Sequence, residues 1–320
     1  MDRLPAAAAP EMTAARAERP VPAGQSARIK ERQNEPLHLQ RLLAYSHMYK
    51  TAQWWRRIRA LGTFALATAA PVIAILVPAS SDILAAISAG WLVAGRTLLA
   101  WLEERGTRTA ATAQELFDTG LFLLPWNAAL AGRPPGPEDI AAAARHIKDS
   151  RRYRDWYSID LGDTPWPGDV LLCQRQSMVW GRRDHRAYAA FIMITGAAWL
   201  AAGLAVALAR DLTLASYLIK IFLPSSPAFL DTLELSRAHW QQAATRENTE
   251  HRIHDLWAEH REDPADIPVA GCREIQDASF LLRRDSPRIP APFYRLRKTA
   301  SDSSTAAGTL ALRGKPERER

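Results

Sequence analysis

Residues 187–209 read AYAAFIMITGAAWLAAGLAVALA and contain no charged side chain. An α-helix rises about 1.5 Å per residue, so a helix of this length covers the roughly 30 Å hydrocarbon core of a bilayer. Apolar residues occupy every face of this segment, which is typical of a membrane span and not of an amphipathic surface helix. The stretch therefore predicts a helical membrane protein.

Three further segments have the length and composition of a span. Residues 60–79 carry no charged side chain, and residues 83–102 carry only Arg96. Residues 212–230 carry Lys220, which costs on the order of 3 kcal/mol at the bilayer centre. They also contain two prolines, which remove helix hydrogen bonds. This last segment is expected to break at its prolines, and either to cross the bilayer or to re-enter it.

Short polar turns join these segments in pairs. The sequence thus predicts an all-α membrane protein with four transmembrane helices, arranged as one hairpin over residues 60–102 and another over residues 187–233. The turns hold only Arg210, whereas basic residues flank the other span ends, which places both turns outside the cytoplasm and both termini inside it. These flanking residues are Lys50, Arg56, Arg57, Arg59, Arg105, Arg108, Arg182, Arg183, Arg186, Arg237 and Arg246.

The rest of the chain is predicted to form cytoplasmic regions that are largely helical. Residues 112–124 are amphipathic, and Glu138 and Asp139 follow a proline at the start of an Ala-rich helix, where acidic side chains are favoured. The two chain ends are too polar to bury a core. The expected regions are a disordered basic tail (1–37), a pre-span helix (38–59), helical central (103–186) and C-terminal (234–298) regions, and a disordered tail (299–320).

The formal net charge is +7, yet the arginines cluster beside apolar runs. Such clusters are typical of cytoplasmic membrane flanks and of contact with anionic lipid, so the lipid bilayer is the expected partner and no nucleic-acid polymer is expected to bind. Cys173 and Cys272 are the two cysteines, which excludes a disulfide framework and a clustered cysteine metal site. A reducing compartment fits this composition.

No motif for an enzyme is present: there is no phosphate-binding glycine loop and no nucleophile elbow. His251 and His254, with His260 nearby, share a helix face and are weighed as a metal site against a solvated polar face. Asp184 and His185 are adjacent, so on a helix they point about 100° apart and do not form an acid–base pair. We expect no catalytic residue, metal or cofactor.

Two basic–aromatic clusters, residues 151–157 and 174–180, have the composition to grip a phosphate and stack a base. The alternatives are interfacial anchors or the core of a helical domain. The candidate ligand-sensing residues are Arg151, Trp156, Arg175 and Trp180.

The predicted spans also contain candidate pore or gate residues: Arg96, Lys220 and Pro224. If the two charges point inward they line a water-filled path, whereas snorkelling of Arg96 toward Arg105 and Arg108 explains the same sequence without a pore. Small residues recur at helical spacing in two spans and predict close helix packing, in a bundle or a homo-oligomer. These ridges are Ala86, Gly90 and Ala94, and Ala197, Ala201, Ala205 and Ala209.

Short motifs around the two hairpins, over about residues 34–298, resemble the four-transmembrane, pore-forming effectors associated with bacterial nucleotide-second-messenger (SMODS) synthases. The chain departs from that family at Ser177, where Asn is expected, and at Gly181, where an acidic residue is usual. The motifs are QRLLA (40–44) with Tyr49-Lys50, LFD (116–118), LPWN (124–127), Trp156-Tyr157, CQR (173–175) with Trp180, and REIQD (273–277) with Arg283, Pro290 and Phe293-Tyr294.

The resemblance implies a non-enzymatic effector of bacterial conflict, held inactive in the inner membrane until a nucleotide signal, such as a cyclic oligonucleotide, opens a pore. An alternative from another class is a non-conducting membrane anchor or scaffold that recruits a cytoplasmic partner.

Overall fold

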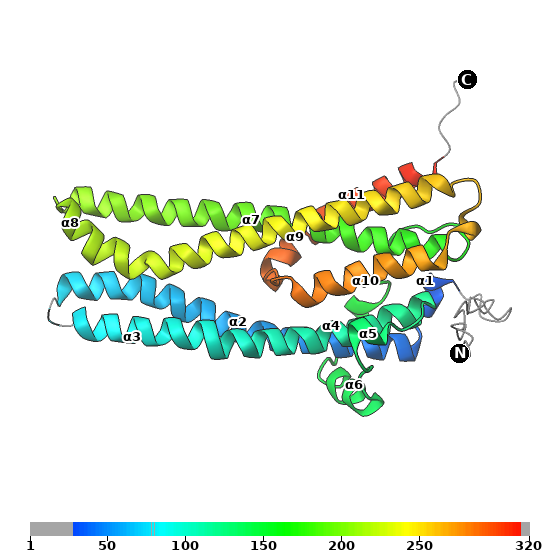
Figure 1. Cartoon of the computed structure of the whole chain (residues 1–320), viewed down its shortest axis with the longest axis horizontal. Coiled ribbons are helices and arrows are strands. Elements are labelled where there is room, and N and C mark those ends of the chain that lie inside the picture. The colour runs from blue at the N-terminus through cyan, green and yellow to red at the C-terminus, as the bar shows by residue number, and fades with distance from the viewer. Residues whose placement is uncertain (1–27, 78, 80, 315–320) are drawn as a thin grey trace, which may run out of the picture.

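The computed structural model describes residues 28–77, 79 and 81–314, and every regular element over these residues is helical. The all-helical class expected from the sequence is thus confirmed for the described chain. Long helices run roughly parallel to the longest axis of the molecule, and the turns of two helical hairpins lie at the end opposite α1 (Figure 1).

The first hairpin joins two long helical runs. After the short helix α1 (Ile29–Arg32), α2 (Pro36–Leu76) begins with a proline, whose missing N–H is not needed at a helix start. The return run consists of α3 (Ser81–Ala94), the π-helical turn η2 (Gly95–Leu99) and α4 (Ala100–Phe122), which packs along α2.

The second hairpin is formed by α7 (Gly168–Ala209) and a return run of α8 (Leu214–Tyr217), the π-helical turn η4 (Leu218–Phe222) and α9 (Leu223–Glu259). Asp211 adopts a left-handed conformation (φ 52°) in the turn between them. No other pair of helices has a more extensive contact than α7 and α9.

The predicted break at the prolines of the fourth segment is wrong, because the return run stays helical from Leu214 through Glu259. Pro227 has no N–H to donate to the Leu223 carbonyl. The Ser226 hydroxyl donates to that carbonyl instead, at 2.8 Å, as serine does beside prolines in membrane helices. The η4 turn directly precedes Pro224 and widens the helix where it would otherwise be crowded.

The remaining helices build a base around the lower parts of both hairpins. They are α5 (Ala128–Ala131), α6 (Pro137–Ala144), η3 (Arg151–Tyr153), η5 (Pro264–Asp266), α10 (Val269–Asp285) and α11 (Ala291–Arg313). Helix α10 contacts α4, α7 and α9. The core here includes the fully buried side chains of Phe117, Leu121, Phe122, Leu171, Leu172 and Ile253.

The structure corrects the expected tail over residues 299–320, since α11 continues to Arg313. Contacts with other helices hold this helix: Thr309 accepts a hydrogen bond from Arg175 (3.2 Å), the Leu312 carbonyl accepts one from Trp257 (3.4 Å), and Phe293 packs against Tyr188. At the other end of the chain, the expected N-terminal tail gives way to structure at Ile29, which is buried in the core. Residues 1–27 and 315–320 lie outside the described residues.

Two helical runs, Asp82–Phe122 and Gly168–Ala209, are long and apolar enough to cross a membrane. We call residues 60–102 and 187–233 the apolar half. Large hydrophobic side chains there are exposed in the single chain, which marks a surface that contacts lipid or other protein. Examples are Leu61, Phe64, Leu76, Ile83, Val93, Ile194, Leu208, Leu214, Ile219 and Leu223.

Candidate functional site

A buried polar network lies at the centre of the base, between α4 and α10. Asp118 is completely buried and accepts hydrogen bonds from Arg283 and from the Tyr157 hydroxyl, the latter at 3.0 Å. Burial raises the pKa of Tyr157, and the neighbouring Asp118 carboxylate raises it further. The tyrosine therefore stays a neutral donor.

Glu115 lies one helical turn before Asp118 and extends the same network. Its carboxylate pairs with Arg273 at 2.6 Å and accepts a hydrogen bond from Gln276 at 2.7 Å. Burial raises the pKa of Glu115, and Arg273 opposes that shift. Gln174 of α7 donates to the Cys272 carbonyl at 2.8 Å, so the network joins three helices.

The central polar network contains residues from four of the motifs that carry the family resemblance, at positions 116–118, 156–157, 173–175 and 273–277. Its charged members are paired with one another. Removing either partner of a buried ion pair strongly destabilises a protein, because the other charge is left unpaired. These motif residues therefore fix the relative positions of α4, α7 and α10. Spacing along the chain did not reveal that the separate motifs converge.

A second polar layer follows the interface of α7 and α9. Arg175 donates to His254 (3.1 Å), which lies 3.8 Å from Glu250. Further along, the interface contains three close ion contacts: Arg182 to Glu250 (2.9 Å), Arg182 to Glu247 (3.5 Å) and Arg186 to Glu247 (2.6 Å). We call these residues the α7–α9 seam.

The structure places two of the four predicted sensor residues, Arg175 and Trp180, on α7, five residues apart and on different faces of that helix. Arg175 belongs to the seam, and Trp180 lies on the same helix with its buried indole N–H unpaired among the described residues. Arg151 is exposed and pairs with Asp149, while Trp156 packs edge-on against Tyr45 in the base. Within the described chain, no hydrogen bond or ion pair joins Arg151 to Arg175.

The histidines singled out from the sequence are separated by their contacts. His254 belongs to the seam, His260 contacts the Leu256 carbonyl, and His251 is exposed. Over residues 28–77, 79 and 81–314, no group of three or more metal-ligating side chains is assembled. Asp184 pairs with Arg297 and His185 contacts His239, so these two neighbours point to different partners.

Arg96 bridges the two hairpins. It lies in the η2 turn and reaches across to α9, where it contacts Asp231 at 2.9 Å and Glu234 at 3.3 Å. Neither Arg105 nor Arg108 is its partner. Sequence reasoning missed the two carboxylates because they follow the predicted fourth span, although their spacing of three residues places them on one helix face.

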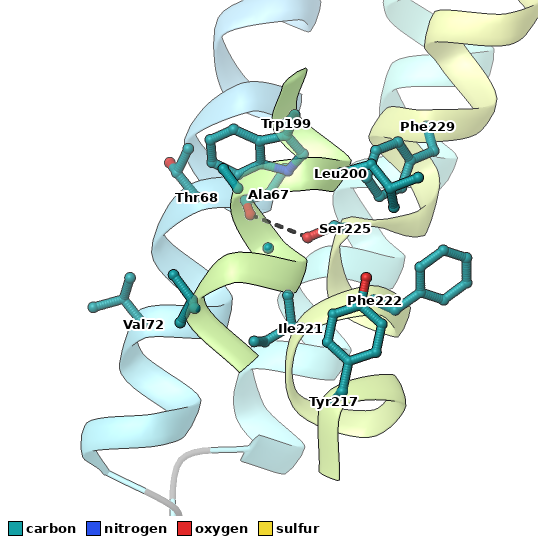
Figure 2. A pocket seen from close by; sticks show the side chains of 13 residues that line it. Ala67, Thr68, Val72, Trp199, Leu200, Tyr217, Ile221, Phe222, Ser225 and Phe229 are labelled. Carbon is teal, nitrogen blue, oxygen red and sulfur yellow. Dashed lines mark hydrogen bonds between the residues drawn. The ribbon is translucent and has the colours of Figure 1, made fainter. Parts of the chain in front are cut away.

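Lys220 lies in the other π-helical turn, η4, and has no ion pair with a described residue. Close to it, a cavity of about 270 Å³ separates α2 from the second hairpin. Figure 2 shows its aromatic lining, from Trp199 to Tyr217, and the hydrogen bond that joins the hairpins at 3.5 Å, from the Ser225 hydroxyl to the Ala67 carbonyl. Pro224 lies next to Ser225, in the first turn of α9.

The fold and these sites together define an all-helical protein of membrane type, with two hairpins projecting from a polar helical base. The sequence model of the SMODS-associating 4TM effector domain family matches residues 27–312, and the chain belongs to this family. The resemblance noted in the sequence is thereby confirmed.

A probable CBASS effector molecule of Bacillus cereus (strain VD146) is similar to this chain, with 28% identity over 194 residues. The alignment covers 60% of this chain and 65% of that relative. No solved structure matches the chain.

Proposed function

We propose that the protein is a signal-gated, pore-forming effector of a bacterial nucleotide-signalling defence system. The observation that carries the proposal is the contact of Arg96 with Asp231 and Glu234, a charged bridge between the two hairpins at the edge of the apolar half. Charges placed in membrane segments are costly and mark ion pathways or gates. Family membership and the similar probable CBASS effector support the same role.

The proposed gate consists of Arg96, Lys220 and Pro224. Both charged residues lie in π-helical turns, which occur frequently at functional sites, and Pro224 follows the second of them. The cavity beside Ser225 leaves room for the hairpins to change their packing without compressing a filled core. Breaking the Arg96 bridge would free the first hairpin from α9.

In this proposal the chains assemble into a homo-oligomer in the inner membrane, with four spans and with both termini in the cytoplasm. The small-residue ridge around Gly90 and the one around Ala201 are both exposed in the single chain. Ridges of this kind allow close helix contact in membranes, so they are available to a second copy. The position of both hairpin turns at one end of the molecule supports the four-span arrangement (Figure 1).

The proposed signal is a cyclic oligonucleotide sensed by the base. Arg175 and Trp180 would bind it at the α7–α9 seam, and Arg151 and Trp156 would have to move toward them or act separately. A ligand shifts the closed–open balance only by binding one state better, and moving it from 1:99 to 99:1 takes a preference of about 10⁴-fold. A ligand at the seam would act directly on the helix pair that forms the second hairpin.

The test uses purified full-length protein in liposomes loaded with a self-quenched dye. Addition of a panel of cyclic di- and trinucleotides should release dye with one member, and Lys220→Leu should reduce that release. Arg96→Leu should raise the leak without signal because it removes the bridge. Intact liposomes under every nucleotide would rule out signal gating.

A non-conducting anchor is the second candidate, favoured by the pairing of Arg96 with Asp231 and Glu234, because a sealed bundle needs counterions for the charges within it. If the protein is an anchor, no variant should release dye from the liposomes. In cells, both Arg96→Leu and Lys220→Leu should then retain the defence phenotype of the wild type. Loss of that phenotype with Lys220→Leu, at unchanged protein level, favours the pore.

A further inference from the structure

Five basic residues converge where the base meets the apolar half: Arg56 of α2, His185 of α7, His239 and Arg246 of α9, and Arg288 between α10 and α11. We call them the buried basic cluster. Arg56 and Arg246 are 9% and 7% exposed, and His239 is completely buried. The rings of His185 and His239 lie 4.8 Å apart, which places α7 and α9 in direct contact here.

Two of the three arginines lack a counterion. Arg246 donates to the neutral groups of Gln242 (3.0 Å) and Ser286 (3.1 Å), and Arg288 stacks 3.3 Å over the Tyr49 ring. Neither forms an ion pair with any residue that the structure describes. The carboxylate that stabilises the charge of Arg56 is that of Glu103. Glu103 already pairs with Arg59, at 3.1 Å.

The cations also act on one another. Burial, together with the neighbouring charges of Arg288 and Arg283, lowers the pKa of Arg246 to about 9. Burial also lowers the pKa of His239, to about 3, with Arg56 and Arg246 acting in the same direction. An uncompensated buried ion costs several kcal/mol, so the cluster favours any anion that reaches it.

Donors remain unused in this cluster. Arg56 Nη1, Arg288 Nε and His239 Nε2 are buried without a hydrogen-bond partner among the described residues. The Nδ1 atoms of His185 and His239 lie 2.7 Å apart, so one donates to the other. When His185 donates, neutral His239 carries its proton on Nε2 and offers a further donor.

We propose that the buried basic cluster is a binding site for a phosphate group. Phosphate oxygens accept charge-assisted hydrogen bonds from several guanidinium groups at once, and arginine provides the planar donors that match them. The phosphate belongs either to an anionic lipid headgroup or to a soluble nucleotide. Only the second source rests on the proposed signal gating.

The site adjoins four elements that gating would have to move. Arg56 lies four residues before the predicted first span, and His185 lies two residues before the third. An anion held there would relieve the mutual repulsion of the arginines and tie α2 to α9 through their basic side chains. Binding therefore stabilises one arrangement of the two hairpins over another.

The experiment measures thermal unfolding of the full-length protein in a neutral detergent by tryptophan fluorescence. Three probes are added separately, each against sodium chloride at equal ionic strength: pyrophosphate, short-chain phosphatidylglycerol against phosphatidylcholine, and a cyclic-dinucleotide panel. Pyrophosphate at about ten times its dissociation constant should raise the Tm by roughly 2 °C. A preference for phosphatidylglycerol assigns the site to lipid, and a larger nucleotide shift assigns it to the signal.

Arg56→Gln is the main variant, since no hydrogen bond of Arg56 to a described residue is lost. It should weaken anion binding about tenfold or more, as should Arg246→Gln. The matched control is Arg252→Gln, an exposed arginine paired with Glu274 on the outer side of α9, which should bind as the wild type does. In the absence of anion, Arg56→Gln should unfold at or above the wild-type Tm, because it removes a buried charge that the other arginines repel.

A wild-type shift no larger than that with chloride for all three probes would overturn the proposal, as would equal shifts in Arg56→Gln and the wild type. The result is separable from pore formation. An anion-dependent shift in a protein that never releases dye leaves the phosphate site standing and removes the gating proposal alone.

Discussion

Asp118 shows how a single side chain fixes the base, because it accepts from Arg283 and Tyr157 while completely buried. Replacing it with asparagine leaves the Arg283 charge buried without its partner. We predict that Asp118→Asn lowers the free energy of unfolding by about 3–5 kcal/mol. The midpoint of thermal unfolding in detergent checks this.

The matched control for that substitution is Asp163→Asn. Asp163 also pairs with an arginine, Arg28, but its side chain is 92% exposed, and exposed pairs contribute little. Its unfolding midpoint should equal that of the wild type. Equal effects of the two substitutions would mean that the central polar network does not stabilise the base.

Asp169, in the first turn of α7, gives a pH prediction. Burial raises its pKa from 3.8 to about 6, so the folded protein binds more protons than the unfolded chain between about pH 4 and 6. Its contribution to stability is therefore complete below pH 4 and falls as the pH rises to 6, by up to about 3 kcal/mol. Asp169→Asn should remove this fall and stabilise the protein at pH 7.

Unfolding midpoints measured from pH 4 to 7 check the Asp169 prediction. Asparagine retains an oxygen that can accept from the Val170 N–H, which the aspartate holds at 2.7 Å. Asp255→Asn, at an exposed position of α9, should show the wild-type pH dependence. A parallel pH profile for Asp169→Asn and the wild type would contradict the prediction.

Sequence patterns identified many important residues but assigned few of their contacts. The motifs at 116–118 and 273–277 were recognised, yet their pairing depends on α10 folding back onto α4 over more than 150 residues of chain. Arg96 was recognised as a costly charge, whereas its partners Asp231 and Glu234 were not. Spacing determines which residues share a helix face, and tertiary packing determines what that face meets.

At the scale of elements, the first hairpin depends on the close approach of α2 and α3. A Cβ atom at Gly62 would lie 1.9 Å from the Trp91 ring, whereas one at Gly90 would meet no atom within 4 Å. We predict that Gly62→Ala destabilises the protein by about 1–3 kcal/mol through overpacking. Gly90→Ala should leave the stability of the single chain unchanged.

Both alanine variants are compared by thermal unfolding in detergent and by size-exclusion chromatography. Since Gly90 lies on an exposed small-residue ridge, its substitution should change oligomer formation instead of chain stability. Identical unfolding midpoints for Gly62→Ala and the wild type would show that the two helices separate freely.

A helix could be predicted from the sequence where its residues are almost all apolar. The prediction failed where a side chain replaces a lost backbone donor or where contacts with distant helices hold polar residues. The third span was clear because twenty-three residues lack a charge. The continuity of α9 through Pro227 was missed because one serine hydroxyl replaces the lost donor. The end of α11 was missed because small polar residues, such as Thr309, are held by contacts with distant helices.

For the whole molecule, the proposed four-span arrangement predicts which positions face outward. The two native cysteines are buried, so introduced cysteines can be labelled selectively. In intact cells made permeable at the outer membrane, a membrane-impermeant maleimide should label Asp211→Cys in the second turn. Glu262→Cys, beyond α9, should react only after the inner membrane is opened. Labelling of Glu262→Cys in sealed cells would reverse the topology.

The sequence predicted an all-helical chain with four spans, and the all-helical class is confirmed for the described residues, in which two helices are long and apolar enough to cross a membrane. The placement of the hairpins relative to each other could not be predicted, because it depends on side chains such as Ser225 and Arg96 that cross between them. Apolar patterning fixes the number of candidate spans, and a few polar contacts fix their arrangement.

The unbroken course of α7 has a mechanical consequence. Its 42 residues form a rod about 63 Å long, which begins among the buried side chains of the base and ends at the hairpin turn. Tilting such a rod by about 5° about its lower end displaces the far end by roughly 5 Å. A movement of about 1–2 Å at the seam is thus amplified, by leverage alone, into a displacement comparable to the pitch of a helix.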